Sequence, residues 1–309
     1  MRHIGVDLHT NSLTVCFLEE NKAERFATYR VDELNVFRQE LRPDDVLAVE
    51  ATGNSNYFYD QLVDSVKEIV VVAPDQFDVI RRSVSKTDKN DARALAFFLS
   101  KEMLPRARIK KKVHREVASL VETRDRIVKL RTVLLNKIHG LLNAHGIKLK
   151  KESLGSEKGL QRALGHNFDR AAQMEIEIIV EQIKSLKKSI ARLDGLINEQ
   201  ALKLEGYDNV ISIKGIGEKS AAILLSVIGD VNEFANENKL AAYFGLVPRV
   251  SNSNETERSG RITKRGSKIG RTTLVQCALV AKKYSGYLNK FYERIKAKRK
   301  LLLRQRKNY

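Results

Sequence analysis

The most constraining feature of this chain is a run of apolar residues that repeats in steps of three and four. The run lies within residues 173–205 and has nine members: Ile176, Ile179, Ile183, Leu186, Ile190, Leu193, Ile197, Ala201 and Leu204. Such steps keep the side chains on one face of an α-helix, close to a heptad seam. The sequence therefore predicts a long helix that buries one side, either in a helical hairpin within the chain or in a coiled coil between chains.

A second long helix is expected over residues 112–146, where the apolar stripe is weaker and is interrupted by Arg124 and Arg131. This part of the chain is strongly basic, because residues 101–151 hold 15 basic and 4 acidic side chains. A solvated helix face is the ordinary explanation of such charge. The size of the excess favours contact with phosphate.

Residues 1–104 alternate between strand and helix signals. Strands are expected at residues 4–8, 12–18, 25–31, 46–50 and 69–73, and helices at 32–41, 57–66 and 87–99. Three strands followed by alternating helices and strands is an α/β order. The fold class expected for the whole chain is thus α/β plus α: an α/β domain, long coiled-coil helices, and a small, mainly helical C-terminal domain.

From Gly206 the composition shifts to glycines and short helices. The turn at Lys214, Gly215 and Gly217 precedes an apolar helix over residues 219–228. This has the form of a helix-hairpin-helix, in which backbone N–H groups at a helix start bind phosphate. A plain helix junction is the alternative. We expect three domains, at residues 1–108, 109–205 and 206–309.

Charge is distributed unevenly along the chain, with an acidic N-terminal part (residues 1–100) and a basic remainder (residues 101–309). The full chain carries 56 Lys and Arg against 38 Asp and Glu, a net charge of +18, yet residues 1–100 alone carry −5. The basic remainder indicates a polyanionic partner, most simply nucleic acid. No apolar run approaches the roughly 18–20 residues that span a bilayer, so we expect a cytoplasmic protein without a membrane partner. Cys16 and Cys277 are expected to be buried and unpaired.

Four carboxylates occupy positions that are costly without a partner. Asp7 lies in an apolar strand, Glu50 ends another strand, and Asp88 and Asp91 share one face at a helix start. Taken singly, the last two suit an ordinary helix N-terminus. Together, the four form a donor set that suits Mg²⁺ acting on a phosphodiester, as in ribonuclease-H-like nucleases of the RuvC type. His9 is a possible neighbour of this site, and the histidines at 114, 139, 145 and 166 are expected on the surface.

The C-terminal segment combines serines with basic residues. Residues 244–249 and 260–266 bracket Ser251, Ser253 and Ser259, and residues 259–271 contain five basic residues and no acidic one. Either this is a surface loop that grips phosphate, or it delivers a serine nucleophile to a phosphodiester. The candidate phosphate contacts are Arg249, Arg261, Lys264, Arg265 and Lys268. The tail from Lys290 adds nine basic residues against Glu293 and indicates a frayed helix or a nucleic-acid-binding extension.

In their order, these residues resemble the DEDD transposases of the insertion-sequence 110 family, relatives of the Piv DNA invertase. The resemblance covers nearly the whole chain and is carried by residues 4–7, 49–53, 86–92, 215–217, 245–248 and 260–266. It implies that Asp7, Glu50, Asp88 and Asp91 are the acidic residues of a RuvC-like domain that binds Mg²⁺. It also implies a nucleophilic serine, for which Ser253 fits the spacing best and Ser251 is the runner-up. Asn254 departs from the family's usual glycine after that serine.

The resemblance further implies a recombinase that cuts and rejoins double-stranded DNA through a covalent phosphoserine intermediate. A guide RNA encoded by the element would pair with donor and target DNA. The protein would form dimers that pair into tetramers, with carboxylates and serine from different protomers, in a bacterial or archaeal cytoplasm and on the nucleoid when active. Two rivals stay open: a RuvC-like magnesium-dependent nuclease with an inert serine, and an architectural DNA-binding protein.

Overall fold

The structure, a computed structural model, describes residues 1–74, 77, 87–253 and 256–305, without the side chains of residues 250–259 and 299–305. Lys86 and Asn254, which the sequence motifs include, lie outside the described residues. The chain divides into two compact units, unit 1 (Met1–Ile109) and unit 2 (Lys110–Tyr309). The three-domain division expected from the sequence stays a prediction. Among the helices of the described residues, none has the length and apolarity to cross a membrane.

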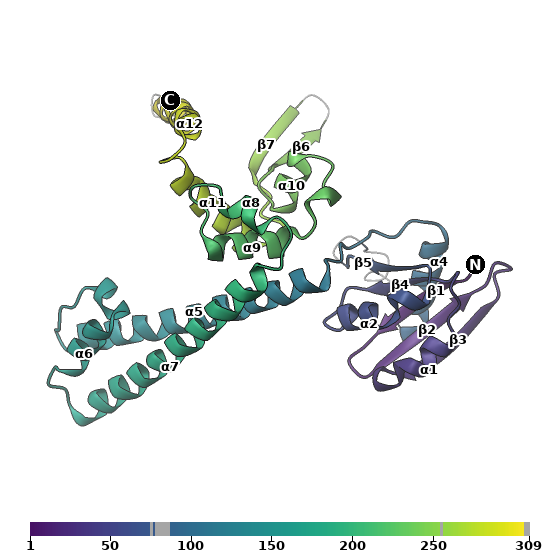
Figure 1. Cartoon of the computed structure of the whole chain (residues 1–309), viewed down its shortest axis with the longest axis horizontal. Helices are drawn as coiled ribbons and strands as arrows, with labels where there is room; N and C mark the ends of the chain where they lie inside the picture. The colour runs from purple at the N-terminus through teal and green to yellow at the C-terminus, as the bar shows by residue number, and fades with distance from the viewer. Residues whose placement is uncertain (75–76, 78–86, 254–255, 306–309) are drawn as a thin grey trace. The chain divides into compact units, whose positions relative to one another are not determined.

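Unit 1 is built on a five-stranded mixed sheet (Figure 1). Its strands are β1 (His3–Leu8), β2 (Ser12–Leu18), β3 (Glu24–Arg30), β4 (Val46–Glu50) and β5 (Glu68–Val72). The spatial order is β3-β2-β1-β4-β5, with β1 to β3 antiparallel and with β4 parallel to both β1 and β5. The helices are α1 (Leu34–Gln39), α2 (Ser55–Leu62) and α4 (Asp88–Ser100), with 3-10 turns η1 (Val31–Glu33) and η2 (Val63–Ser65).

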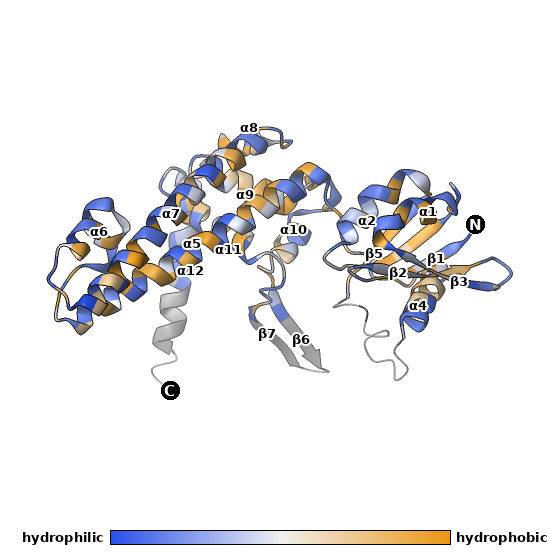
Figure 2. Ribbon diagram, turned by 90° about the horizontal axis from the view of Figure 1, so that it is seen from below, coloured by the Kyte–Doolittle hydropathy of each residue, from blue (hydrophilic) through white to orange (hydrophobic). Residues whose placement is uncertain are grey.

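The two faces of this sheet are covered by different helices (Figure 2). Alternate residues such as Ile4, Val6 and Leu47 pack with α1 and α2 in the larger core. The intervening residues, Ala48 and Val70 among them, face α4. Strand residues alternate between faces, so one strand serves both layers. Consequently, the face that carries α4 is also the face toward which Gly5, Asp7 and Glu50 are directed.

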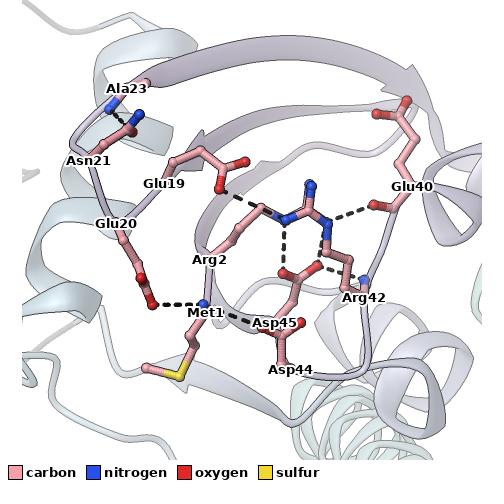
Figure 3. Close-up of polar contacts among 10 residues, drawn as sticks. All are labelled: Met1, Arg2, Glu19, Glu20, Asn21, Ala23, Glu40, Arg42, Asp44 and Asp45. Atoms are coloured by element: carbon pink, nitrogen blue, oxygen red, sulfur yellow. Dashed lines mark hydrogen bonds and ion pairs between the residues drawn. The ribbon is translucent and has the colours of Figure 1, made fainter.

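A buried ion pair holds β1 to the start of β4 (Figure 3). The Arg2 guanidinium donates to both carboxylate oxygens of Asp45, at 2.9 and 2.6 Å, and also to the Glu40 carbonyl at 2.7 Å. Both side chains are almost fully buried. The Val46 N–H donates to the Arg2 carbonyl, so the side-chain pair and the backbone tie the two strands at the same end. This arrangement fixes the parallel register on which Asp7 and Glu50 depend.

Unit 2 begins with the hairpin form of the long helices. Helix α5 (Lys112–Ala144) packs along α7 (Arg170–Ala201), with η3 (Lys151–Gly155) and α6 (Glu157–Leu164) at the bend. The seam of α7 is buried against α5 in the same chain, for instance Ile176 and Ile183 with Ile138. Arg124, which interrupts the apolar stripe of α5, forms an ion pair with Asp194 of α7 across the hairpin. The seam is therefore packed within the chain, in the hairpin that the sequence offers as one of two alternatives.

The rest of unit 2 contains short helices and a two-stranded ribbon. The elements are α8 (Tyr207–Ile211), α9 (Glu218–Ile228), η4 (Val231–Glu233), α10 (Glu237–Tyr243), β6 (Pro248–Ser253), β7 (Thr256–Ile262), α11 (Lys268–Ala281) and α12 (Gly286–Gln305). Helix α9 packs against α5, α7 and α11 and so joins this part to the hairpin. This part of the chain is mainly helical, as expected from the sequence, and the β6–β7 ribbon takes the place of the surface loop that the sequence had suggested. Pairing of β6 with β7 gives backbone groups there cross-strand partners, which a loop would leave to solvent.

His114 corrects another expectation. It was expected at the surface, but it is 3% exposed. It shares a helix face with Val117 and Val121, three and seven residues further on, and this face of α5 is the one that packs in the core. Both cysteines are buried and unpaired, as the sequence predicts.

Candidate active site

Asp7 and Glu50 lie side by side because two parallel strands end together. Strands β1 and β4 are paired up to Val6 and Val49, so Asp7 and Glu50 each follow the last paired residue. Both are on the face of the sheet that α4 covers. Parallel strands present their carboxyl ends at one edge, which is where polar site residues of such sheets gather. The register thus brings together two acids that are 43 positions apart in the sequence.

Asp88 and Asp91 reach the same edge because α4 packs unusually close to β1. A Cβ atom on Gly5 would lie 2.0 Å from the Ala92 carbonyl oxygen and 2.5 Å from the Ala96 nitrogen. Only glycine permits that approach of helix to strand. The side chain of Thr87 caps α4 by accepting from the Asn90 N–H at 3.2 Å, so the first turn, with both acids, begins at the sheet edge.

All four acids line one pocket of about 400 Å³. Its other polar lining residues are His9, Thr52 and Thr87, and an apolar wall is formed by Leu8, Val72, Pro74, Phe77 and Leu95. The carboxylates come from two strands and one helix, so tertiary packing assembles the set. A pocket with several carboxylates on one side and apolar cover on the other can hold a cation and restrict water around it.

His9, which the sequence indicates as a neighbour of this site, is a further member of the cluster. Its Nε2 atom lies 3.1 Å from Asp7 Oδ2 and 3.5 Å from Asp88 Oδ2. His9 follows directly after β1. Its spacing of two residues from Asp7 is the sequence signal that indicates a place beside this carboxylate. The imidazole bridges an acid of β1 and an acid of α4.

Burial and charge act together on Asp7, whose side chain is 16% exposed. Burial is the largest cause of its raised pKa; the His9 imidazole lowers that pKa, and the carboxylates of Asp88 and Asp91 raise it again. A bound cation would favour the charged form of the Asp7 carboxylate and would therefore lower its pKa.

The donor set fits a hard divalent cation. Asp7, His9 and Asp88 offer ligand atoms that all lie within 4.8 Å of one another, and Glu50 and Asp91 line the same pocket. Carboxylate oxygens are the ligands that Mg²⁺ prefers, and it keeps several of its waters. The geometry is thus suited to metal-assisted chemistry on a phosphodiester.

The serines predicted as nucleophiles lie in the β6–β7 ribbon of unit 2. Ser251 is paired with Arg258, and Ser253 is paired with Thr256 at the end of β6. Ser253 directly precedes residues 254–255, which are outside the described residues. The better-matching serine is thus the last residue of β6, and the runner-up lies two positions earlier on the same strand.

Backbone contacts interlock the two motifs that flank this ribbon. Gly245 has φ 68°, and a Cβ atom there would lie 2.0 Å from the Arg265 carbonyl oxygen. The Thr263 N–H donates to the Val247 carbonyl at 2.9 Å, and the Lys264 N–H donates to the Gly245 carbonyl at 3.1 Å. The predicted contacts Arg249, Arg261, Lys264, Arg265 and Lys268 are all exposed. The two segments that flank the ribbon are therefore packed tightly against each other, and the predicted basic contacts on and beside them are exposed to solvent.

The turn before α9 has a packing role alongside its predicted phosphate contact. Gly215 has φ 111°, and a Cβ atom there would lie 2.7 Å from the Ala281 nitrogen. Lys214 is exposed, and Gly217 is the N-cap of α9. The pocket at this helix start is also lined by Asp194 and Glu218. These carboxylates compete with phosphate, and phosphate contact by the turn stays a prediction.

An acid-lined pocket on a mixed sheet, joined to a basic helical unit, is an arrangement suited to enzymes that act on nucleic acid. Comparison of the sequence with known protein families identifies the class of enzyme as transposases. A DEDD transposase domain of the IS110 type matches residues 4–147, and a domain described as "Transposase IS116/IS110/IS902 family" matches residues 207–293.

Curated relatives agree with this class. A probable family 20 transposase of Pseudomonas aeruginosa is 26% identical over 284 residues, covering 90% of this chain and 83% of the relative. The transposase for insertion sequence element IS1111A of Coxiella burnetii is 27% identical, covering 75% of this chain and 64% of the relative. The pilin gene-inverting protein of Moraxella lacunata is 26% identical, covering 96% and 88%. The chain is a DNA transposase, and it belongs to the IS110 family.

Proposed function

We propose that this transposase cuts and rejoins DNA strands through a covalent phosphoserine intermediate, assisted by Mg²⁺ held at Asp7, Glu50, Asp88 and Asp91. The observation that carries the proposal is the convergence of these four carboxylates on one pocket from β1, β4 and α4. The sheet order β3-β2-β1-β4-β5 supports a RuvC-like, ribonuclease-H-like assignment for unit 1.

The chain's own residues prepare the metal site. Glu50 ends β4 and Asp7 lies near the end of β1, so both are held by the sheet, while Asp88 and Asp91 are held by the capped start of α4. When bound, Mg²⁺ would supply a Lewis acid for the phosphodiester oxygens. His9 holds Asp7 and Asp88 in position from the side.

The serine step needs a nucleophile that conserves bond energy. The Ser253 oxygen forms a bond to phosphorus while the bond from phosphorus to one deoxyribose oxygen breaks; the serine proton is lost, and the released sugar oxygen gains a proton. Attack by a sugar hydroxyl of another strand reverses these changes and rejoins the DNA. Arg249, Arg261, Lys264, Arg265 and Lys268 would bind the charged phosphate around this step.

Target choice is proposed to come from a guide RNA that pairs with both DNA partners. The basic composition of residues 101–151 supports phosphate binding in this part of the chain. Assembly as a dimer and then a tetramer is part of the same proposal and rests on family resemblance, because the α7 seam is already buried against α5.

The test uses purified full-length protein, co-expressed element RNA, Mg²⁺ and end-labelled junction DNA, resolved on a denaturing gel. Wild type is expected to form a protein–DNA adduct that Ser253→Ala and Asp88→Ala both abolish. Ser259→Ala is the matched serine control and Asp64→Asn is an acidic control, while Ser251→Ala tests the runner-up nucleophile and is expected to keep the adduct if Ser253 is the attacking residue. Omitting the RNA is expected to abolish the adduct.

A second function is favoured by the fact that the pocket belongs entirely to unit 1. On this alternative, unit 1 is a magnesium-dependent, structure-specific nuclease, and the serine takes no part. Cleavage without an adduct, unchanged by Ser253→Ala and lost in Asp88→Ala, would establish this alternative and overturn the phosphoserine proposal.

A further inference from the structure

The last helices of unit 2 expose a stripe of aromatic and aliphatic side chains. Tyr284 precedes α12, and Tyr287, Leu288, Phe291 and Ile295 lie on it. Tyr287 is 78% exposed and Tyr284 64% exposed, and the other three are also exposed. Steps of four residues place Tyr287, Phe291 and Ile295 on one face, with successive levels about 6 Å apart along the axis. We call these five residues the α12 stripe.

Cations border the α12 stripe. At about 100° per residue, Lys290, Arg294 and Lys298 follow one edge of it, and Glu293 lies on the opposite side of the helix. Glu293 is paired with Lys296 at 3.2 Å. The Arg294 guanidinium lies 5.1 Å from the Phe291 ring centroid, so cation and ring already meet at this edge. Exposed rings and exposed cations are therefore interleaved over one helix face.

We propose that the α12 stripe is a stacking platform for single-stranded nucleic acid. Tyr284, Tyr287 and Phe291 offer ring faces to unpaired bases, and the Lys290–Arg294–Lys298 edge tracks the phosphates, as in proteins that bind single strands without reading sequence. This inference rests on the proposed function only in taking nucleic acid as the partner. Unpaired strands are exposed when a guide RNA pairs with DNA or when a DNA duplex opens. The inference adds a place on the protein where such strands are held.

Charge and ring chemistry select this occupant over others. A second copy of α12 on the stripe would bring two basic edges together, which is repulsive. A duplex buries its base faces in its own stack, so it would contact the cations but leave the rings without partners. A single strand satisfies both the rings and the cations.

Binding is measured by fluorescence anisotropy with full-length protein in metal-free buffer. The probes are fluorescein-labelled oligo-dT, oligo-rU and a duplex, each of about 20 nucleotides. Tyr287→Leu/Phe291→Leu keeps apolar volume but removes the rings. We expect this variant to lose single-strand affinity about tenfold or more, with duplex affinity nearly unchanged. Lys296→Gln, off the stripe, is the matched control and is expected to bind as wild type.

Comparing oligo-dT with oligo-rU distinguishes a DNA strand from an RNA strand as the natural ligand. A loss of affinity of the leucine variant for either probe supports the platform. If the leucine variant binds both single strands like wild type, the platform is excluded. If it instead changes only the sedimentation of the free protein, the stripe is an interface between copies, and the proposal is overturned. The readout needs no strand transfer, so its failure is distinct from failure of the phosphoserine proposal.

A second readout uses the absence of tryptophan from the chain. Tyr287→Trp introduces a single indole on the stripe, and stacking of a base on it is expected to quench its emission as oligo-dT is added. Tyr57→Trp, at a half-exposed tyrosine of unit 1, is the control and is expected to keep its emission. Quenching at neither position would contradict stacking at the stripe.

Discussion

Gly5 and Ala92 approach so closely that a Cβ atom on Gly5 would lie 2.0 Å from the Ala92 carbonyl oxygen. This contact sets the distance between β1 and α4, and thereby between Asp7 and the two acids of α4. Carboxylates that share a metal must be held within a fraction of an ångström, so the packing of a glycine determines whether this candidate site has such a geometry.

Gly5→Ala is expected to displace α4 and destabilise unit 1. Overpacking of a tight contact costs about 1–3 kcal/mol. The measurement is urea unfolding followed by circular dichroism. Gly53→Ala is the matched control, since a Cβ there meets nothing within 4 Å. Equal stability of the two variants would show that α4 does not depend on this close approach.

Asp7→Asn is expected to change the pH dependence of stability. Because the pKa of Asp7 is raised in the folded protein, chiefly by burial, the unfolded chain loses this proton first. The free energy of unfolding of wild type therefore falls as pH rises from the ordinary aspartate range through the raised pKa. The asparagine side chain of the variant carries no such proton, so the variant gains relative to wild type over that interval and keeps the gain above it.

This comparison is made by urea unfolding in EDTA from acid to neutral pH. Asp32→Asn is the control with the opposite sign: Arg30 lowers the pKa of Asp32 at the exposed surface, so any contribution of that pair is lost as pH falls. A stability difference between wild type and Asp7→Asn that does not vary with pH would contradict a raised pKa at Asp7.

Mg²⁺ is expected to stabilise the folded chain through the pocket. A ligand that binds only the folded state adds about 2.7 kcal/mol at one hundred times its Kd. The measurement is the shift in Tm of unit 1 with added Mg²⁺. Asp7→Asn and Asp88→Asn are expected to lose the shift, whereas Asp64→Asn, an exposed acid outside the pocket, keeps it. A shift that survives in Asp7→Asn would place the cation elsewhere.

Arg2→Met is expected to cost about 3–5 kcal/mol, because it leaves the fully buried Asp45 carboxylate without its partner. Arg2→Met/Asp45→Leu, which removes both charges, should recover much of that loss. The exposed pair Arg30–Asp32 supplies the comparison, since Arg30→Met is expected to cost less than about 1 kcal/mol. Urea unfolding measures all three, and similar losses for Arg2→Met and Arg30→Met would contradict a structural role for the buried pair.

Local patterns predicted most elements of the fold. The strands of unit 1, the helix that starts at Asp88 and the two long helices follow from apolar periodicity and from Thr87 as a cap, because these signals are local. The β6–β7 ribbon was missed, because its short strands lie among glycines and charges whose pattern resembles a loop. His114 was misplaced because burial of a helix face depends on what packs against it.

For the candidate site, sequence patterns alone indicate which carboxylates are present, that they lie at strand ends and a helix start, and which family they resemble. That the four side chains meet in one pocket follows only from how the strands and α4 pack. The parallel register of β1 and β4, held by Arg2 and Asp45, aligns Asp7 with Glu50, and the close packing of α4 on Gly5 adds Asp88 and Asp91. Likewise, only packing determined that the α7 seam is buried against α5, since a heptad pattern specifies an apolar face but not its partner.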